Sequence, residues 1–427
     1  MLHLDISATL AKAITPSLGI PEQEINALRT SLRRYTEDWL KERQNGKHLW
    51  AMDPYNKQTI DLVKETVDRV KTQNIRTVVW IGIGGSGLGP KVIQEVFEGP
   101  QTVEFILLDT IDPSMIELTM QLIDWKRALL VVASKSGGTL EPMSLFFFCW
   151  EKLKQARKDQ AADYTIGITD PHAGVLRSFC LEHGIAMLPI PTEVGGRYSI
   201  FSPIGLLPLG LLDANIDAFM RGAKEMDTLC QQTSLDDNPA SLLAAVQFLL
   251  DTKRDYPVRV IMPYIQQLTS LARWNQQLIA ESLGKTETSN PLPLSAIGTQ
   301  DQHSLLQQWM QGPRKYWHLF IRELEKPRVY VPEEVEGSFG YIAGKTFGQL
   351  LDACYEGTSQ ALTAAKRPHV TITLPRLDEE NLGQLFFLLL AEVVLLGKLY
   401  RIDPYGQPGV ELGKKITKKI LSHGQEE

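Results

Sequence analysis

The chain has 427 residues, enough for roughly two to three domains, and 43% of them are hydrophobic, which supports substantial apolar cores. Its 44 Lys and Arg against 50 Asp and Glu give a formal net charge of −6, which argues against nucleic acid as the main partner. The four cysteines lack the spacing of a zinc site or a disulfide framework, so we expect a protein of the reducing cytoplasm.

The sequence has no pattern that indicates export or a membrane anchor. The N-terminus lacks a basic region followed by an apolar run, so we predict no signal peptide. The most apolar segment, residues 385–396, is shorter than the ~20 residues of a membrane span and contains Glu392. We therefore expect no membrane partner and interpret this segment as a buried helix.

Residues 1–45 have a polar, helical pattern. Leu28, Leu32, Tyr35 and Trp39 fall at helical spacing and could form one apolar face. We interpret this region as a helical arm packed on a domain.

From about residue 75, short apolar runs alternate with helical patterns, which predicts a parallel sheet covered by helices on both faces. The predicted strands are residues 77–83, 103–108, 128–133, 165–169 and 185–190, and the predicted helices are residues 90–97, 113–124, 141–158 and 173–182. In such sheets ligands bind at the carboxyl ends of the strands.

After Pro203 the pattern is mainly helical to about Asp251, and a second alternating pattern follows. Its predicted strands are residues 258–262, 328–331 and 369–374, with helices such as 265–283 and 378–399. The fold class is therefore α/β, with two doubly wound parallel-sheet domains of flavodoxin-like type, a helical N-terminal arm and a C-terminal helix. We place the boundaries at 1–45, 46–202 and 203–427. No Gly/Ser linker separates the two domains, so we expect a large interface between them.

A glycine-rich turn follows the first predicted strand, at Gly82, Gly84, Gly85, Gly87 and Gly89. Glycines between a strand and a helix allow a sharp turn with exposed N–H groups, and the helix N-terminus adds partial positive charge. Ser86 places a hydroxyl at this predicted anion site. The spacing also fits a dinucleotide fingerprint, with Asp109 as the ribose acid, and a turn that serves only helix packing is the third interpretation.

Two further loops carry polar groups suited to an anion. Ser134, Lys135, Ser136 and Thr139 lie in a loop after the third predicted strand, at the start of a helix. One N-cap needs one hydroxyl, so three of them favour a phosphomonoester site over capping alone. Arg197 follows Gly195 and Gly196, and its guanidinium suits an oxyanion, although a surface ion pair is the usual role of an arginine.

Six segments resemble the motifs of the phosphoglucose isomerase (glucose-6-phosphate isomerase) family, which has the sugar isomerase (SIS) fold. In chain order they are Gly84-Gly85-Ser86-x-Leu88-Gly89-Pro90, Ser134-Lys135-Ser136-x-x-Thr139-x-Glu141, Gly195-Gly196-Arg197-Tyr198-Ser199-x-x-Ser202-Pro203-x-Gly205, Glu281-Ser282-x-Gly284-Lys285, Gly298-Thr299-x-x-Gln302-His303 and Gln407-x-Gly409-Val410-Glu411-Leu412-Gly413-Lys414. They keep the family order over roughly residues 80–415, and six ordered motifs are far more specific than one.

The resemblance implies a role for each matching residue. It implies a phosphate site made of Gly85, Ser86, Ser134, the Lys135 backbone, Ser136 and Thr139. It implies Glu281 as the base that moves a proton between C2 and C1, and Arg197 as the group that stabilises the enediolate. It implies His303 and Lys414 as aids to ring opening, with Gln407 lining the pocket. It also implies a homodimer, because the histidine comes from the neighbouring subunit.

The implied chemistry needs no metal and no redox cofactor, because a carboxylate can take the proton α to a carbonyl and return it one carbon along. Residue type alone gives plainer interpretations: Glu281 as a solvated glutamate paired with Lys285, His303 as a surface histidine, and Lys414 as part of a charged helix face. For these three residues the catalytic interpretation comes from the resemblance.

Some positions depart from the family pattern, and two other function classes remain as alternatives. Ser136 replaces the common threonine, Pro142 replaces another threonine, and Gly406 and Pro408 replace an acid and an aromatic residue. A non-catalytic sugar-phosphate sensor would keep the phosphate loops without needing Glu281, Arg197, His303 and Lys414 together. A dinucleotide-dependent oxidoreductase would not need the hydroxyl-rich loop at Ser134–Thr139.

Overall fold

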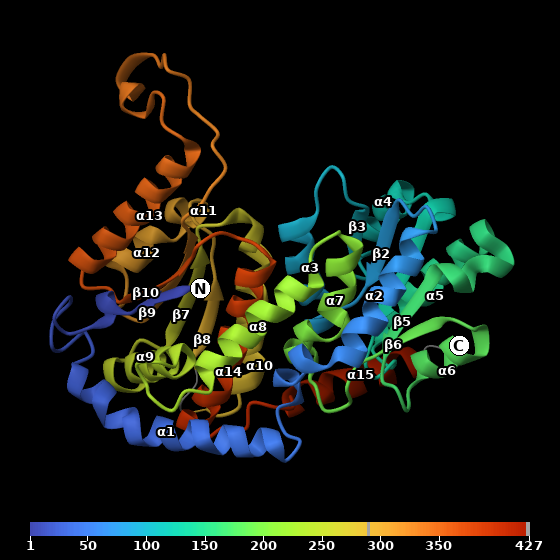
Figure 1. The fold of residues 1–427 in the computed structure, drawn as a ribbon, viewed down its shortest axis with the longest axis horizontal. Coiled ribbons are helices and arrows are strands. Elements are labelled where there is room, and N and C mark those ends of the chain that lie inside the picture. The colour runs from blue at the N-terminus through green and yellow to red at the C-terminus, as the bar shows by residue number, and fades with distance from the viewer. Residues whose placement is uncertain (288–290, 424–427) are drawn as a thin grey trace.

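The computed structural model describes residues 1–287 and 291–423, which form two five-stranded sheets flanked by helices (Figure 1). The first sheet contains β2 (Thr77–Ile81), β3 (Glu104–Leu108), β4 (Ala128–Ala133), β5 (Thr165–Thr169) and β6 (Ala186–Pro189). Its order is β3-β2-β4-β5-β6 and every pair is parallel. The five predicted strands of this sheet are confirmed, with ends that differ by at most two residues.

The first sheet is buried because helices cover both of its faces, as its Val- and Ile-rich strands predict. One face shares a core with α2 (Lys57–Lys71), α3 (Gly85–Phe97) and α7 (Pro203–Leu211). The other face shares a core with α4 (Pro113–Leu122), α5 (Leu140–Arg157) and α6 (Val175–His183). This arrangement confirms the predicted doubly wound α/β class.

The second sheet contains β1 (His3–Asp5), β7 (Val258–Pro263), β8 (Leu292–Ser295), β9 (Tyr316–Glu323) and β10 (His369–Leu374), in the order β1-β10-β9-β7-β8. One face shares a core with α9 (Pro239–Arg254), α10 (Thr269–Leu283) and α14 (Glu379–Tyr400), and α8 (Ile216–Cys230) packs on α14. Near the other face lie α11 (Gln300–Ser304), α12 (Leu306–Gln311) and α13 (Phe347–Ala364). The core on the α14 side is continuous with the core under α2, α3 and α7.

The N-terminal region contributes a strand as well as a helix. β1 pairs antiparallel with β10, so the sequence prediction of a purely helical arm misses one edge strand of the second sheet. The helix α1 (Glu22–Gln44) buries Leu32 and Trp39 on one face and packs against α9 and α14. The predicted apolar face of the arm is thus present, while the three domain boundaries stay a prediction.

The apolar segment 385–396 is a core helix, as its length and Glu392 predict. It forms the middle of α14, a helix long and apolar enough to cross a membrane, but 89% of its most apolar window is buried inside the protein. Glu392 Oε1 lies 2.7 Å from the guanidinium of Arg259 on β7, and both side chains are fully buried. The ion pair explains how a carboxylate is accommodated in so apolar a helix.

The prediction of a strand at residues 328–331 is wrong. This segment belongs to a long connection between β9 and α13 that extends away from the body of the protein, drawn in orange in Figure 1. Pro327 and Pro332 flank it, and proline cannot donate a ladder hydrogen bond. The strand that pairs with both β7 and β10 is β9, which lies earlier in the chain. The strand β8, which pairs with β7, was also not predicted from the sequence.

Two glycines allow α8 and α14 to pack closely. A Cβ added to Gly222 of α8 would lie 1.9 Å from the carbonyl oxygen of Glu380, and one added to Gly383 of α14 would lie 2.1 Å from that of Phe219. Neither contact can be relieved by a side-chain rotation, because the atoms that would be struck belong to the backbone. The helix crossing therefore depends on both glycines.

We predict that Gly383→Ala lowers the free energy of unfolding by roughly 1–3 kcal/mol, because the two helices must move apart. Chemical denaturation of the purified variant measures this change. The matched control is Gly357→Ala on α13, where an added Cβ meets no atom of the described chain within 4 Å. There the better helix propensity of alanine should leave stability unchanged or raise it by up to about 1 kcal/mol. Equal effects at the two positions would contradict the prediction.

Candidate active site

Three loops meet at the carboxyl edge of the first sheet. β2 and β4 are parallel neighbours, so the loops that follow them leave the sheet side by side. A Cβ added to Gly85, after β2, would lie 2.1 Å from the carbonyl carbon of Gly196, so these two backbones are in contact. The Lys135 ammonium, after β4, donates to the carbonyl oxygens of Thr192 and Val194 in the loop that precedes Gly196. The first and second loops are thus both tied to the third.

The glycine turn is shorter than the sequence predicts, because α3 already begins at Gly85. Gly84 is the N-cap with φ 58°, in the region that favours glycine, so the strand turns directly into the helix. The prediction started the helix at residue 90, since glycine has a low helix propensity. Ser86 therefore lies in the first turn of α3, next to the partial positive charge of the helix N-terminus.

The hydroxyls predicted to bind phosphate are largely free to do so. Within residues 1–287 and 291–423, no hydrogen bond is made by the side chains of Ser86, Ser134 and Thr139. Thr139 occupies the N-cap position of α5 but its side chain accepts no bond from the helix, so the capping interpretation does not account for it. Ser136 is exposed, and its hydroxyl accepts only a 3.3 Å bond from the Gly138 N–H.

Lys135 is half-buried, and burial lowers the pKa of its ammonium. Its side chain faces the third loop, where its two carbonyl acceptors are polar but uncharged. The Lys135 side chain therefore holds the loop from Thr192 to Val194 in place.

Arg197 uses all five of its N–H groups. It lies in the 3-10 helix η6 (Gly196–Phe201) and is only 4% exposed. The Nε group donates to Ser282 Oγ (2.7 Å), and Nη2 donates to the carbonyl oxygens of Pro404 (2.7 Å) and Gly406 (3.1 Å). The Nη1 group donates to Glu281 Oε2 (3.2 Å) and Gln407 Oε1 (3.1 Å). One guanidinium thus joins three segments that are distant in sequence.

Glu281 reaches the glycine turn because α10 packs antiparallel to α3. At one end of the pair, Glu95 of α3 accepts bonds from the backbone N–H (2.8 Å) and hydroxyl (2.6 Å) of Ser270. At the other end, a Cβ added to Gly84 would lie 3.0 Å from Gln277 Nε2, which donates to Glu281 Oε1 at 2.9 Å. The carboxylate therefore lies near the start of α3, with its side chain 29% exposed.

The interpretation of Glu281 as a glutamate paired with Lys285 is wrong. The Lys285 ammonium instead donates to the carbonyl oxygens of Asp403 and Tyr405, and burial lowers its pKa. These acceptors precede Gln407, so Lys285 holds the segment that contacts Arg197. Glu281 is left with Arg197 and Gln277 as partners.

His303 and Lys414 lie outside this cluster in the single chain. His303 is an exposed residue of α11. Lys414 lies on α15 (Glu411–His423), and its ammonium is 2.8 Å from Glu411 Oε1, with both side chains more than half exposed. The structure therefore unites Glu281, Arg197 and Gln407, and leaves the other two candidates at the surface.

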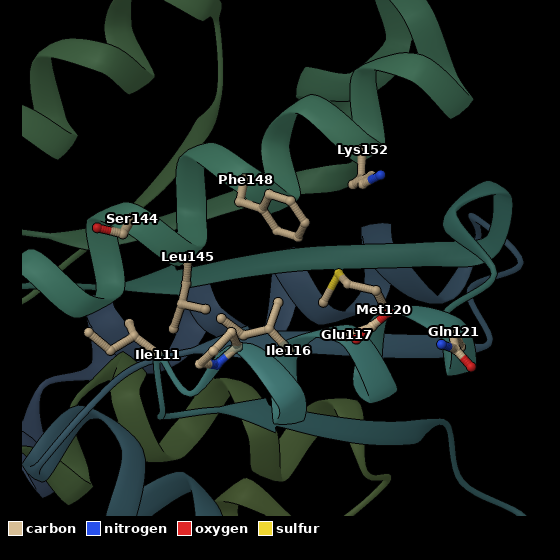
Figure 2. Close-up of a pocket in the computed structure, with 10 residues that line it drawn as sticks. Ile111, Ile116, Glu117, Met120, Gln121, Ser144, Leu145, Phe148 and Lys152 are labelled. Atoms are coloured by element: carbon tan, nitrogen blue, oxygen red, sulfur yellow. The ribbon is translucent and has the colours of Figure 1, made fainter.

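A separate cavity of about 670 Å³ lies between α4 and α5. Figure 2 shows Phe148 and Lys152 of α5 on one side of it and Glu117 and Met120 of α4 on the other. Its walls are mainly apolar and include none of the candidate catalytic or substrate-binding residues. We therefore do not place the reaction there.

The sequence reasoning missed the groups that hold the cluster together. These are Gln277, the Ser282 hydroxyl, and the carbonyl oxygens of Pro404 and Gly406. The sequence places Gln277 one helical turn before Glu281, but Lys285 rather than Gln277 was predicted as the partner of the carboxylate. Every residue has a backbone carbonyl, so the sequence does not indicate which carbonyls accept bonds from Arg197.

Comparison with known proteins identifies the family. The phosphoglucose isomerase family model matches residues 56–427. The chain belongs to this family. A glucose-6-phosphate isomerase from Rubrobacter xylanophilus is 36% identical over 85% of this chain and 87% of its own. A probable glucose-6-phosphate isomerase from Haloarcula marismortui is 33% identical over 98% of this chain and 94% of its own.

A solved structure shares the fold of the whole chain. A hypothetical protein from Thermus thermophilus superposes with a TM-score of 0.90, is 31% identical, and covers 99% of this chain and 100% of its own. Membership of the phosphoglucose isomerase family confirms the resemblance. It leaves the oxidoreductase interpretation of Gly82, Gly84, Gly87 and Asp109 without support.

We predict that Lys135→Met loosens the third loop without unfolding the protein, because it removes both ammonium bonds to that loop. Hydrogen–deuterium exchange of peptides that cover residues 192–197 should become faster. The control is Lys154→Met on α5, whose ammonium contacts only the exposed Glu151 within the described chain, and exchange in 192–197 should there stay as in the wild type. Unchanged exchange in Lys135→Met would show that the two bonds do not hold the loop.

Proposed function

We propose that this protein interconverts glucose 6-phosphate, which appears in the names of its relatives, and the corresponding ketose, fructose 6-phosphate. The observation that carries the proposal is the position of Glu281. Its carboxylate contacts Arg197 and Gln277, beside a turn whose neighbouring hydroxyls lack partners in the described chain. A base, a fixed cation and an anion site within reach of one small molecule are what an aldose–ketose isomerisation requires.

In this proposal the phosphate occupies the carboxyl edge of the first sheet. The hydroxyls of Ser86, Ser134, Ser136 and Thr139 donate to its oxygens, and the N-terminus of α3 at Gly85 adds partial positive charge. Hydroxyls suit this task because each can turn its proton toward the ligand. The unpaired state of three of them in the described chain supports this assignment.

Glu281 acts as the base that carries the proton between C2 and C1. A general base of this kind is worth roughly 10²–10⁴-fold in rate. Arg197 and Gln277 each hold one carboxylate oxygen, which fixes the direction in which the remaining lone pairs point. The carboxylate is partly exposed, which leaves room for the sugar carbons to approach it.

Arg197 stabilises the enediolate through the Nη1 end of its guanidinium. The Nε and Nη2 groups are held by Ser282 and by two backbone carbonyls, so they cannot turn to a ligand. The Nη1 group donates to Glu281, which it holds in place, and to the side chain of Gln407, which can rotate away and free one N–H. We therefore assign Nη1 as the donor that a substrate oxygen takes over, an interaction worth several kcal/mol at a developing oxyanion.

Ring opening requires a proton donor near the ring oxygen, which we assign to His303 with help from Lys414. A histidine can exchange a proton near neutral pH. We propose that His303 enters the site of a second subunit, so that the active form is a homodimer in the cytoplasm. Its exposed place on α11, outside the cluster of its own chain, supports a contribution across an interface.

We predict that Glu281→Gln lowers kcat by roughly 10²–10⁴-fold, because the amide cannot accept the proton. A coupled assay that detects fructose 6-phosphate formed from glucose 6-phosphate measures this loss. Binding of a sugar-phosphate competitive inhibitor, measured by calorimetry, should change less than about threefold, since the phosphate groups are untouched. The control is Glu117→Gln in the α4–α5 cavity, which should leave turnover unchanged.

Near wild-type turnover in Glu281→Gln would defeat the assignment of the base. Tight sugar-phosphate binding by a wild-type protein that shows no turnover would instead favour the non-catalytic sensor.

We predict that two inactive variants restore activity when they are mixed. Glu281→Gln and His303→Ala, unfolded together and refolded at equal concentration, should form mixed dimers in half of the assemblies. Each mixed dimer has one intact site, so activity should recover to about a quarter of the wild-type value. Analytical ultracentrifugation checks that dimers are present. Recovery should be absent if His303 serves its own chain, because then every site carries a defect.

A further inference from the structure

The segment from Asp403 to Gln407 is the part of the site that lies farthest along the chain from Arg197 and supplies three of its acceptors. These are the carbonyl oxygens of Pro404 and Gly406 and the side-chain oxygen of Gln407. Gly406 has φ 69°, and the segment has no regular secondary structure before the 3-10 helix η9 (Pro408–Val410). The Lys285 ammonium holds the carbonyl oxygens of Asp403 and Tyr405, and a second set of bonds holds the Tyr405 side chain.

The side chain of Tyr405 joins a row of polar groups from three elements, which are α1, the 3-10 helix η2 (Leu49–Ala51) with its N-cap His48, and α14. Its hydroxyl lies 2.5 Å from His48 Nδ1 and accepts a bond from the Trp50 indole at 3.0 Å. His48 Nε2 lies 2.8 Å from Glu42 Oε2 at the end of α1. Both oxygens of Glu42 lie 3.0 Å from the Lys398 ammonium of α14.

The donor and the acceptor of each hydrogen bond among Glu42, His48 and Tyr405 follow from the chemistry of these groups. A carboxylate can only accept, so His48 donates from Nε2 to Glu42, and its Nδ1 keeps the lone pair. The Tyr405 hydroxyl must then donate to Nδ1, while its oxygen accepts from Trp50. Burial lowers the pKa of His48 and raises that of Tyr405, so both stay neutral near pH 7, as this arrangement requires.

A cavity of about 480 Å³ adjoins the same groups. Its walls include Glu42, His48, Trp50, Lys398, Pro404 and Tyr405. The Tyr405 ring borders this open space on one side and packs on the Tyr198 ring, with centroids 5.0 Å apart, on another, so the hydroxyl bonds and this ring contact together set where it lies. If those bonds were lost, the ring and its backbone could shift toward the cavity.

We propose that Tyr405 and His48 are positioning residues for Arg197: they hold the 403–407 segment so that its carbonyls keep the guanidinium in place. Neither residue contacts Arg197 or Glu281 in the described chain through a hydrogen bond, so they act through the backbone. The inference rests on the proposed isomerase function, in which Arg197 meets the oxyanion. Losing the alignment costs transition-state stabilisation more than substrate binding.

The test is Tyr405→Phe, which keeps the ring and removes the shared hydroxyl. We expect kcat for glucose 6-phosphate to fall by roughly ten- to a hundredfold and KM to stay within about threefold, because the phosphate site is untouched. The matched control is Tyr400→Phe at the end of α14, shortly before Tyr405 in the chain, which removes a hydroxyl that donates to Asp251 Oδ2 of α9 at 2.6 Å. That variant should lose stability in thermal unfolding but keep kcat.

A second variant tests the hydrogen bond between Tyr405 and His48. His48→Asn suits the backbone of this position, which has φ 57° and ψ 40°, because asparagine tolerates that region. We expect the loss of kcat in the Tyr405→Phe/His48→Asn double variant to be close to that of Tyr405→Phe alone, since the two side chains act as one unit. Additive losses in kcat would overturn the assignment.

Hydrogen–deuterium exchange separates this inference from the proposed function. In the protein without substrate, Tyr405→Phe should speed exchange in peptides that cover residues 403–407, whereas Tyr400→Phe should not. If the wild type shows no isomerase activity, the function fails while the exchange result still reports on the segment. If the wild type is active but Tyr405→Phe keeps its kcat, or if both tyrosine variants lose kcat equally, the positioning role is wrong.

Discussion

The site depends on one buried guanidinium whose hydrogen-bonding capacity is fully used. Arg197 donates five bonds to residues from 281–282 and 404–407, so it links the end of α10 with the segment before α15. A buried cation without this set of acceptors would be strongly destabilising. The same bonds that stabilise the charge in the fold therefore also fix the geometry of the carboxylate beside it.

Two helices from different sheets bring this cluster to the anion loops. α3 starts at the carboxyl edge of the first sheet, and α10 packs on it in the opposite direction. The end of α10 consequently lies beside the start of α3, where Gly84 leaves room for Gln277. A single helix contact thus brings loops of the first α/β sheet, with the hydroxyls proposed to bind phosphate, beside the carboxylate of a helix that packs on the second sheet.

Much of the fold and site could be predicted from the sequence. Alternating apolar runs located β2 to β6, because buried parallel strands are apolar on both faces. The flanking prolines of 328–331 were overlooked, and β9 was missed because its Tyr, Trp and His residues do not form a simple apolar run. The pairing of Glu281 with Arg197 was not visible, since residues 84 positions apart meet only through the helix packing. The backbone acceptors of Arg197 carry no signal in residue type.

The continuous apolar core has a consequence for how the protein moves during turnover. One cluster of buried side chains runs from the helices under the first sheet through α14 to the second sheet. Swinging the two halves apart would expose that surface to water at about 25 cal/mol for each Å². Full separation of the two halves is therefore costly, and the shared core favours movements of loops and side chains over separation of the halves.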